Sequence, residues 1–216
     1  MTQVLGLRSP GLRRVAALTA GMTALAATVV LTTLLHTPDE TSALASDGEG
    51  AAPRTVAAGP PPIAHAALPH SAPIRVQLPT LGVDTAVVAL GRTPSGGADV
   101  PGHASTVGWL VDGPTPGEAG TAVLTGHIEL AFERGSFFSL HSLRPRDTVR
   151  VVRADGRIGV FTVYRVEEVA QQHALAHATG PTDEPELRLL TAVNPVDARD
   201  PALVVSARLT AVTEGA

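Results

Sequence analysis

Short runs of alternating hydrophobic and polar residues recur along the C-terminal two thirds of the chain. Alternation with a period of two is typical of strands that bury one face. Proline, glycine and asparagine separate many of these runs, as expected at strand ends. The predicted strands comprise residues 74–78, 81–90, 107–109, 121–125, 148–153, 157–166, 187–192 and 202–209.

The hairpin formed by residues 148–153 and 157–166 is the clearest of these predictions. Its strands are joined through Asp155-Gly156, a pair favoured in tight hairpin turns. Helical signals are few: a helical turn at residues 171–178 and a short helix at 137–143. With about eight mostly antiparallel strands and no alternation of strands with helices, we expect a mainly β domain. A closed β-barrel is the expected architecture, since closure removes exposed sheet edges.

The N-terminal region follows a different pattern, because residues 15–35 are apolar or small and carry no charge. At about 1.5 Å per residue, this run covers the roughly 30 Å of hydrocarbon in a bilayer. Arginines precede it and Asp39-Glu40 follow it, which favours an N-terminus inside the cell and the remaining chain outside. We therefore predict a single-pass anchor in the cell membrane. A cleaved signal peptide, with Ala43-Leu44-Ala45 as its cleavage site, is the alternative.

Residues 36–72 are rich in proline, alanine, glycine and serine. Such a segment buries too little apolar surface to offset the entropy lost on ordering, so we predict a disordered linker. We therefore divide the chain into four regions: a cytoplasmic basic segment at 1–14, a transmembrane anchor at 15–35, the linker at 36–72 and a β-barrel domain at 73–216.

Composition limits the chemistry that this chain can perform. None of the 216 residues is cysteine, which excludes disulfides, thiolate metal sites and a thiol nucleophile. A net charge of -4 without a basic cluster beyond the N-terminus argues against nucleic-acid binding. His173 and His177 would share one helix face, but no third ligand lies near them in the sequence. We therefore predict no metal and no cofactor.

Two predicted strands end beside residues that could form a site. Strand 121–125 leads to His127, and strand 187–192 ends at Ala192. Arg199 lies in the loop before the last strand. Taken alone, a histidine at a strand end more often has a structural role than a catalytic one. Arg199 fits a surface ion pair with a neighbouring aspartate equally well.

These two segments resemble the catalytic segments of sortases, the cell-surface cysteine transpeptidases of Gram-positive bacteria. The sequence LRLLTA, which ends at Ala192, resembles the sortase pattern L-x-L-I/L-T-C with alanine where the cysteine belongs. Residues 115–147, TPGEAGTAVLTGHIELAFERGSFFSLHSLRPRD, are similar to the segment that carries the catalytic histidine, here His127. The resemblance covers residues 73–212 and points to the small actinobacterial classes E and F.

The resemblance implies a sortase-like barrel and a peptide ligand. In sortases a thiolate attacks the carbonyl between Thr and Gly of an LPxTG-type sorting signal, a histidine protonates the leaving amine, and an arginine stabilises the oxyanion. The matching positions here are Ala192, His127 and Arg199, with Arg208 as a second candidate for the arginine. Because a methyl group cannot form an acyl-enzyme, the expected protein is a membrane-anchored, monomeric pseudoenzyme that retains a peptide-binding cleft.

The alternative is an active class E/F-like transpeptidase or hydrolase acting on a sorting signal. It requires either that Ala192 replaces a natural cysteine or that another residue serves as the nucleophile. Thr191 is a poor replacement, because adjacent residues of a strand face opposite ways. Val193-Asn194 stands where related sequences often carry small residues such as glycine, and this drift favours natural loss of the cysteine.

Overall fold

A computed structural model describes residues 52–96, 99–192 and 200–215 of the chain. These residues belong to one compact unit, Ser46–Ala216. The basic segment and the membrane anchor, predicted at residues 1–35, lie outside the described residues. Within the described ranges, no helix has both the length and the apolar character that a membrane crossing needs.

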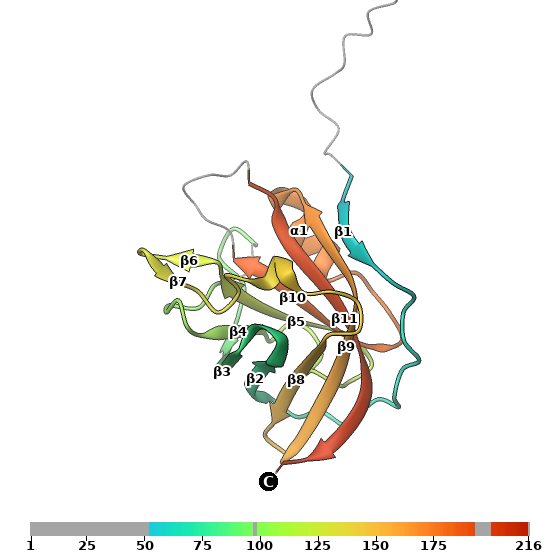
Figure 1. The fold of residues 1–216 in the computed structure, drawn as a ribbon. Coiled ribbons are helices and arrows are strands. Elements are labelled where there is room, and N and C mark those ends of the chain that lie inside the picture. The colour runs from blue at the N-terminus through green and yellow to red at the C-terminus, as the bar shows by residue number, and fades with distance from the viewer. Residues whose placement is uncertain (1–51, 97–98, 193–199, 216) are drawn as a thin grey trace, which may run out of the picture. The chain divides into compact units, whose positions relative to one another are not determined.

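Eight strands of this unit form a closed β-barrel (Figure 1). Neighbouring strands follow the order β9-β11-β10-β5-β4-β3-β2-β8, and β8 pairs with β9 again, which closes the sheet. The pairs β3–β4 and β5–β10 are parallel, and the other barrel pairs are antiparallel. These findings confirm the predicted mainly β, closed architecture. The strands are β2 (Pro73–Leu78), β3 (Val83–Leu90), β4 (Val107–Leu110), β5 (Gly120–His127), β8 (Thr148–Arg153), β9 (Arg157–Val169), β10 (Pro185–Ala192) and β11 (Ala202–Glu214).

The shorter elements agree with the sequence pattern to different degrees. The β8–β9 hairpin is present as predicted, and the expected helical turn is the helix α1 (Gln171–Ala178). The short helix expected at residues 137–143 is reduced to the 3-10 turn η2 (Leu140–Ser142). Another 3-10 turn, η1 (Pro79–Leu81), follows β2. A small hairpin of β6 (Glu129–Leu130) and β7 (Glu133–Arg134) was not predicted. Strands of two residues are too short to show an alternation.

Strands β5 and β10 are buried on both faces, one face packing inside the barrel and the other against α1. Leu124 of β5 and Leu189 of β10 point into the main core inside the barrel. Val123 and Leu190, one position away on each strand, pack in a second cluster with Ala174 of α1. Because strand side chains alternate, one face of this strand pair lines the barrel interior and the other faces α1.

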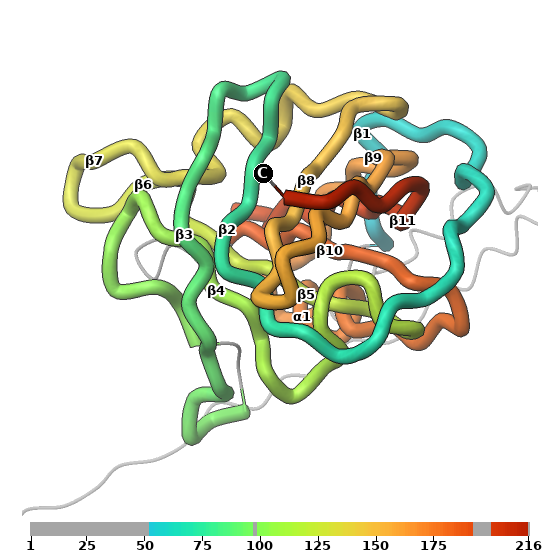
Figure 2. Tube along the Cα trace, turned by 90° about the horizontal axis from the view of Figure 1, so that it is seen from below, coloured from blue at the N-terminus to red at the C-terminus, as the bar shows by residue number. Residues whose placement is uncertain are grey.

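Of the predicted linker at residues 36–72, the structure describes residues 52–72, and this part is ordered against the barrel. Within that segment, β1 (Arg54–Ala58) pairs with β9. Residues 59–72, here called the N-terminal strap, then run around the outside of the barrel from β1 to β2 (Figure 2). Backbone N–H groups of the strap donate to barrel carbonyls, as in the 2.7 Å bond from His65 to Leu209 and the 2.8 Å bond from Leu68 to Gly117.

The strap is held by polar contacts together with one apolar side chain, Leu68, which packs against the main core. The side chain of Arg153 is fully buried, and its guanidinium donates to the backbone carbonyls of Pro69 and Pro116. A composition argument considers only what a segment can bury by itself. It does not include carbonyls that find donors on a neighbouring sheet.

Candidate functional site

His127 and residue 192 lie side by side at the ends of two adjacent strands. β5 and β10 run parallel, and their register pairs Gly120 with Pro185 at one end and His127 with Ala192 at the other. Adjacent strands of a sheet are about 4.8 Å apart. The pairing therefore brings together the two positions that the sequence pattern singles out, although they are 65 residues apart in the chain.

The imidazole of His127 is buried and bonded to a backbone carbonyl. The side chain lies on the same face of β5 as Val123, the face toward α1, because the two residues are four positions apart. His127 is 6% exposed, and its Nε2 is 2.7 Å from the carbonyl oxygen of Pro101, in the loop between β3 and β4. A carbonyl oxygen only accepts, so this bond requires a proton on Nε2 and leaves Nδ1 as the acceptor in the neutral ring.

Two glycines allow the chain to pack closely around His127. A Cβ on Gly126 would lie 2.9 Å from the ring of Phe137, and one on Gly135 would lie 2.0 Å from the carbonyl oxygen of His127. That carbonyl also accepts a 2.9 Å hydrogen bond from the N–H of Phe137. The role of Gly126 is thus close contact with an aromatic ring.

Thr191 precedes residue 192 and is committed to a hydrogen bond within the barrel. Its Oγ1 accepts from the backbone N–H of Leu203 at a distance of 2.8 Å, and the residue is buried. The bond links the end of β10 to the start of β11. This contact gives Thr191 a structural role at the strand end.

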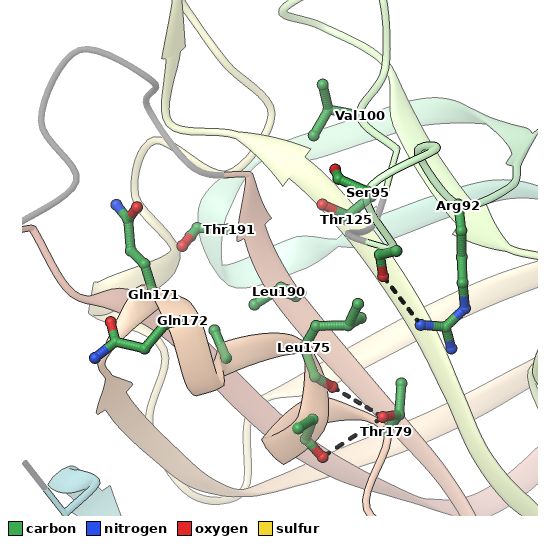
Figure 3. A pocket seen from close by; sticks show the side chains of 13 residues that line it. Arg92, Ser95, Val100, Thr125, Gln171, Gln172, Leu175, Thr179, Leu190 and Thr191 are labelled. Atoms are coloured by element: carbon green, nitrogen blue, oxygen red, sulfur yellow. Dashed lines mark hydrogen bonds between the residues drawn. The ribbon is translucent and has the colours of Figure 1, made fainter. Parts of the chain in front are cut away.

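A cavity of about 620 Å³ adjoins the His127 end of the two strands (Figure 3). Its floor consists of strand residues, its first wall belongs to α1 and the turn after it, and its second wall belongs to the segment after β3. The floor includes Thr125, Leu190 and Thr191, and the walls include Gln171, Gln172, Leu175 and Thr179 opposite Arg92, Ser95 and Val100. Amides, hydroxyls and aliphatic groups all contribute to the lining of this cavity.

Of the two candidate arginines, the structure describes only Arg208. Arg199 lies outside the described residues. Arg208 of β11 pairs with Glu186 of β10. Glu186 lies six positions before residue 192 in the same strand, so the pair is about 20 Å from residue 192. Its guanidinium is 2.8 Å from a carboxylate oxygen of Glu186. Arg208 therefore does not lie beside His127.

Glu186, Arg188, Arg208 and Tyr164 form a buried charged cluster at the other end of β10. The Tyr164 hydroxyl donates to Glu186 at 2.9 and 3.0 Å. Burial acts to raise the pKa of the Glu186 carboxyl. The charge of Arg188, and the hydrogen bonds that Arg208, Arg188 and Tyr164 donate to the carboxylate, outweigh burial and hold this pKa below its ordinary value. Burial, together with the neighbouring carboxylate, raises the pKa of Tyr164. The cluster ties β9, β10 and β11 together.

The histidines do not assemble a metal site in the part of the chain that the structure describes. His177 of α1 lies 2.9 Å from the carboxylate of Glu167, so its partner is an acidic residue of β9. No group of three or more potential ligands occurs among the described residues.

Comparison with known families identifies the family of this chain. A profile described as the sortase domain matches residues 76–210, which include β5, His127 and β10. This chain belongs to the sortase family. Among curated proteins none matches it.

Solved sortase structures share the barrel of this family member at low sequence identity. Sortase A of Listeria monocytogenes is 14% identical, with a TM-score of 0.52, over 67% of this chain and 92% of the other. Sortase C1 of Streptococcus agalactiae is 22% identical, with a TM-score of 0.52, over 66% and 69% of the two chains. Sortase C-3 of Streptococcus pneumoniae is 18% identical, with a TM-score of 0.51, over 73% and 72%. At these identities the likeness supports the fold alone.

Sequence reasoning missed the parts of this sortase-family site that lie outside the two motifs. The acceptor for His127 is the backbone carbonyl of Pro101, and a backbone group leaves no mark in the residue pattern. The wall residues come from the short helix α1 and from the Arg92 segment, a loop without periodicity. Only the helical turn at residues 171–178 gave a signal, and it did not show which surface the helix covers.

Proposed function

We propose that this chain is a cell-surface, sortase-like protein that binds sorting-signal peptides and does not carry out ordinary transpeptidation. The observation that carries the proposal is the register of β5 and β10, in which Ala192 stands beside His127 next to an open cavity. In the family reaction this position holds the thiol that forms the acyl-enzyme. Alanine at this position offers no atom that can attack a carbonyl.

The cost of the missing nucleophile is large. Loss of the nucleophile from a catalytic unit lowers turnover by about a millionfold, so a retained histidine cannot compensate. Peptide binding does not depend on the thiol, because affinity comes from the groove. His127, the cavity and its mixed polar and apolar walls therefore support binding without turnover. Arg199 is proposed as the arginine of the site.

Three finer assignments belong to this proposal. The chain is assigned to the actinobacterial class E/F-like sortases on the pattern around His127 and Ala192. Residues 15–35 anchor it in the cell membrane with the barrel outside the cell, since the uncharged run follows arginines and precedes acidic residues. The protein acts as a monomer, because every strand of the closed barrel has a neighbouring strand on both sides and offers no free edge to a second chain.

The test is the substitution Ala192→Cys in the full-length chain, incubated with a synthetic LPATG peptide. If His127 and the groove retain the family geometry, mass spectrometry detects a covalent acyl-enzyme in this variant. The double variant Ala192→Cys with His127→Ala is the matched control and gives at least about a hundredfold less adduct, since it lacks the acid/base group. The unmodified chain binds the peptide in calorimetry without cleaving it.

Two results contradict the proposal. Absence of both peptide binding and an adduct in Ala192→Cys means that the groove no longer serves a sorting signal. Turnover of the peptide by the unmodified chain instead supports an active enzyme with a different nucleophile.

A further inference from the structure

A second cavity continues the groove beyond the part beside His127. It has a volume of about 460 Å³, and Thr121 and Val123 of β5 contribute to its lining. Arg92 and Thr179 line both cavities. Figure 3 shows these two residues at one side of the first cavity, one on the segment after β3 and the other just after α1. Because they share this boundary, the two hollows are adjacent, and the row they follow is here called the groove.

One row of side chains on β5 runs along the whole groove. Thr121, Val123, Thr125 and His127 are spaced two residues apart, so they project from the same face of the strand. Thr121 and Val123 line the second cavity, Thr125 lines the first, and His127 ends the row. The groove therefore has a direction, leading away from the site of chemistry along a single strand.

The length of this row exceeds what a five-residue sorting motif needs. Six strand positions separate His127 from Thr121, a distance of about 20 Å. The four motif residues before the cleaved bond cover about 13 Å when extended, which reaches from His127 to the neighbourhood of Val123. Space for two or three more residues remains, and it coincides with the second cavity.

We propose that the second cavity binds the two or three residues that precede the sorting motif, so that the groove recognises an extended peptide of about seven residues. This inference rests on the proposed peptide-binding function. The N-terminal part of the signal is the part that an acyl-enzyme retains, whereas the C-terminal part leaves as the amine. A groove that leads away from His127 on one side suits the retained part.

The lining of the second cavity indicates which residues it accepts. Most of its wall is small or uncharged, including Gly113, Pro114, Pro181 and Thr182. Its two charged groups neutralise each other, since Nε of Arg92 lies 2.8 Å from the Asp112 carboxylate. A wall of this kind favours small uncharged residues, because a charged residue would lose hydration without gaining a partner.

The experiment compares three peptides on the full-length chain by calorimetry: LPATG, AAALPATG and LPATGAAA. We expect AAALPATG to bind at least about fivefold more tightly than LPATG. The affinity of LPATGAAA should lie within about twofold of the affinity of LPATG. The variant Thr182→Trp places a large ring at a position that lines only the second cavity. It should abolish the advantage of AAALPATG and leave the affinity for LPATG unchanged.

Asp183→Trp is the matched control, because it adds the same bulk at the next, exposed position, which does not line the cavity. It should keep the advantage of the longer peptide. Equal affinities of LPATG and AAALPATG overturn this inference while leaving the proposed function standing. The same holds if LPATGAAA alone binds more tightly than LPATG. If none of the three peptides binds, the proposed function fails together with it.

Discussion

At the scale of single residues, His127 is positioned almost entirely by backbone groups. Its Nε2 meets the carbonyl of Pro101, and its own carbonyl accepts from Phe137. Gly135 approaches that carbonyl so closely that no side chain fits between them. A histidine held in this way keeps its orientation whichever side chain stands at position 192.

Replacing Gly135 with alanine tests this arrangement. Because the new Cβ would lie 2.0 Å from the His127 carbonyl oxygen, the backbone must shift, and we expect the free energy of unfolding to fall by about 2 kcal/mol or more. Urea denaturation measures the change. Gly102→Ala is the control, since a Cβ there meets nothing within 4 Å, and it should change stability by less than about 0.5 kcal/mol. Equal stability of the two variants contradicts the close packing described here.

At the scale of elements, β10 has different roles at its two ends. Its C-terminal end brings residue 192 to His127, while its N-terminal end carries Glu186 in contact with Arg188, Arg208 and Tyr164. Arg208 also donates to the carbonyl of Pro62 in the N-terminal strap. The charged cluster therefore stabilises the element that delivers the site, without belonging to the site.

The lowered pKa of Glu186 predicts a dependence of stability on pH. The carboxyl has an ordinary pKa of 4.5 and a lower pKa in the folded chain, so the unfolded chain binds more protons in this range. The resulting stability is fully present above about pH 5 and is lost as the pH falls through the folded pKa. Glu186→Gln should cost about 2 kcal/mol at pH 7, because two arginines lose their counter-charge in a mostly buried cluster.

Urea denaturation of both proteins between pH 7 and pH 3 measures this effect. The difference in unfolding free energy between the unmodified chain and Glu186→Gln should shrink as the pH falls, since acid protonates the native carboxylate. Glu133→Gln, on the exposed strand β7, is the control and should differ little from the unmodified chain at any pH. A difference for Glu186→Gln that stays constant down to pH 3 refutes the assignment.

At the scale of the whole barrel unit, the N-terminal strap extends the folded domain beyond the sortase profile. The profile begins at residue 76, whereas β1 and the strap add backbone hydrogen bonds to β9, β11 and the turn before β5. Arg153 contributes from the end of β8. The unit that folds together thus begins before the boundary at residue 73 that the sequence suggested.

Two truncated chains test this boundary. A chain that starts at Pro73 loses the β1 pairing and the strap contacts, and each lost hydrogen bond costs about 1 kcal/mol. We expect its melting temperature to lie about 10 °C below that of a chain starting at Ser46. Calorimetric scans of the two chains at equal concentration provide the measurement. Matching melting temperatures would restore the boundary at residue 73.

The strands and the two motifs could be predicted from the sequence because both depend on local order. Leu187 and Leu189 alternate with polar or outward residues, and such a period is visible without knowing what the strand pairs with. The likeness of LRLLTA and the segment around His127 to sortases identified positions 127 and 192 in the same way. The membrane anchor and Arg199 remain predictions, since they lie outside the described residues.

How distant segments meet follows from strand pairing across the barrel. The acceptor for His127 is a carbonyl in another loop, a buried arginine donates to the Pro69 carbonyl of the strap, and α1 and the segment after β3 form opposite walls of the first cavity. These features depend on pairings between residues far apart in the chain, and a local pattern carries no information on such pairings. The local pattern was therefore enough to place the strands and to single out positions 127 and 192, while the closure of the barrel set the surroundings of His127.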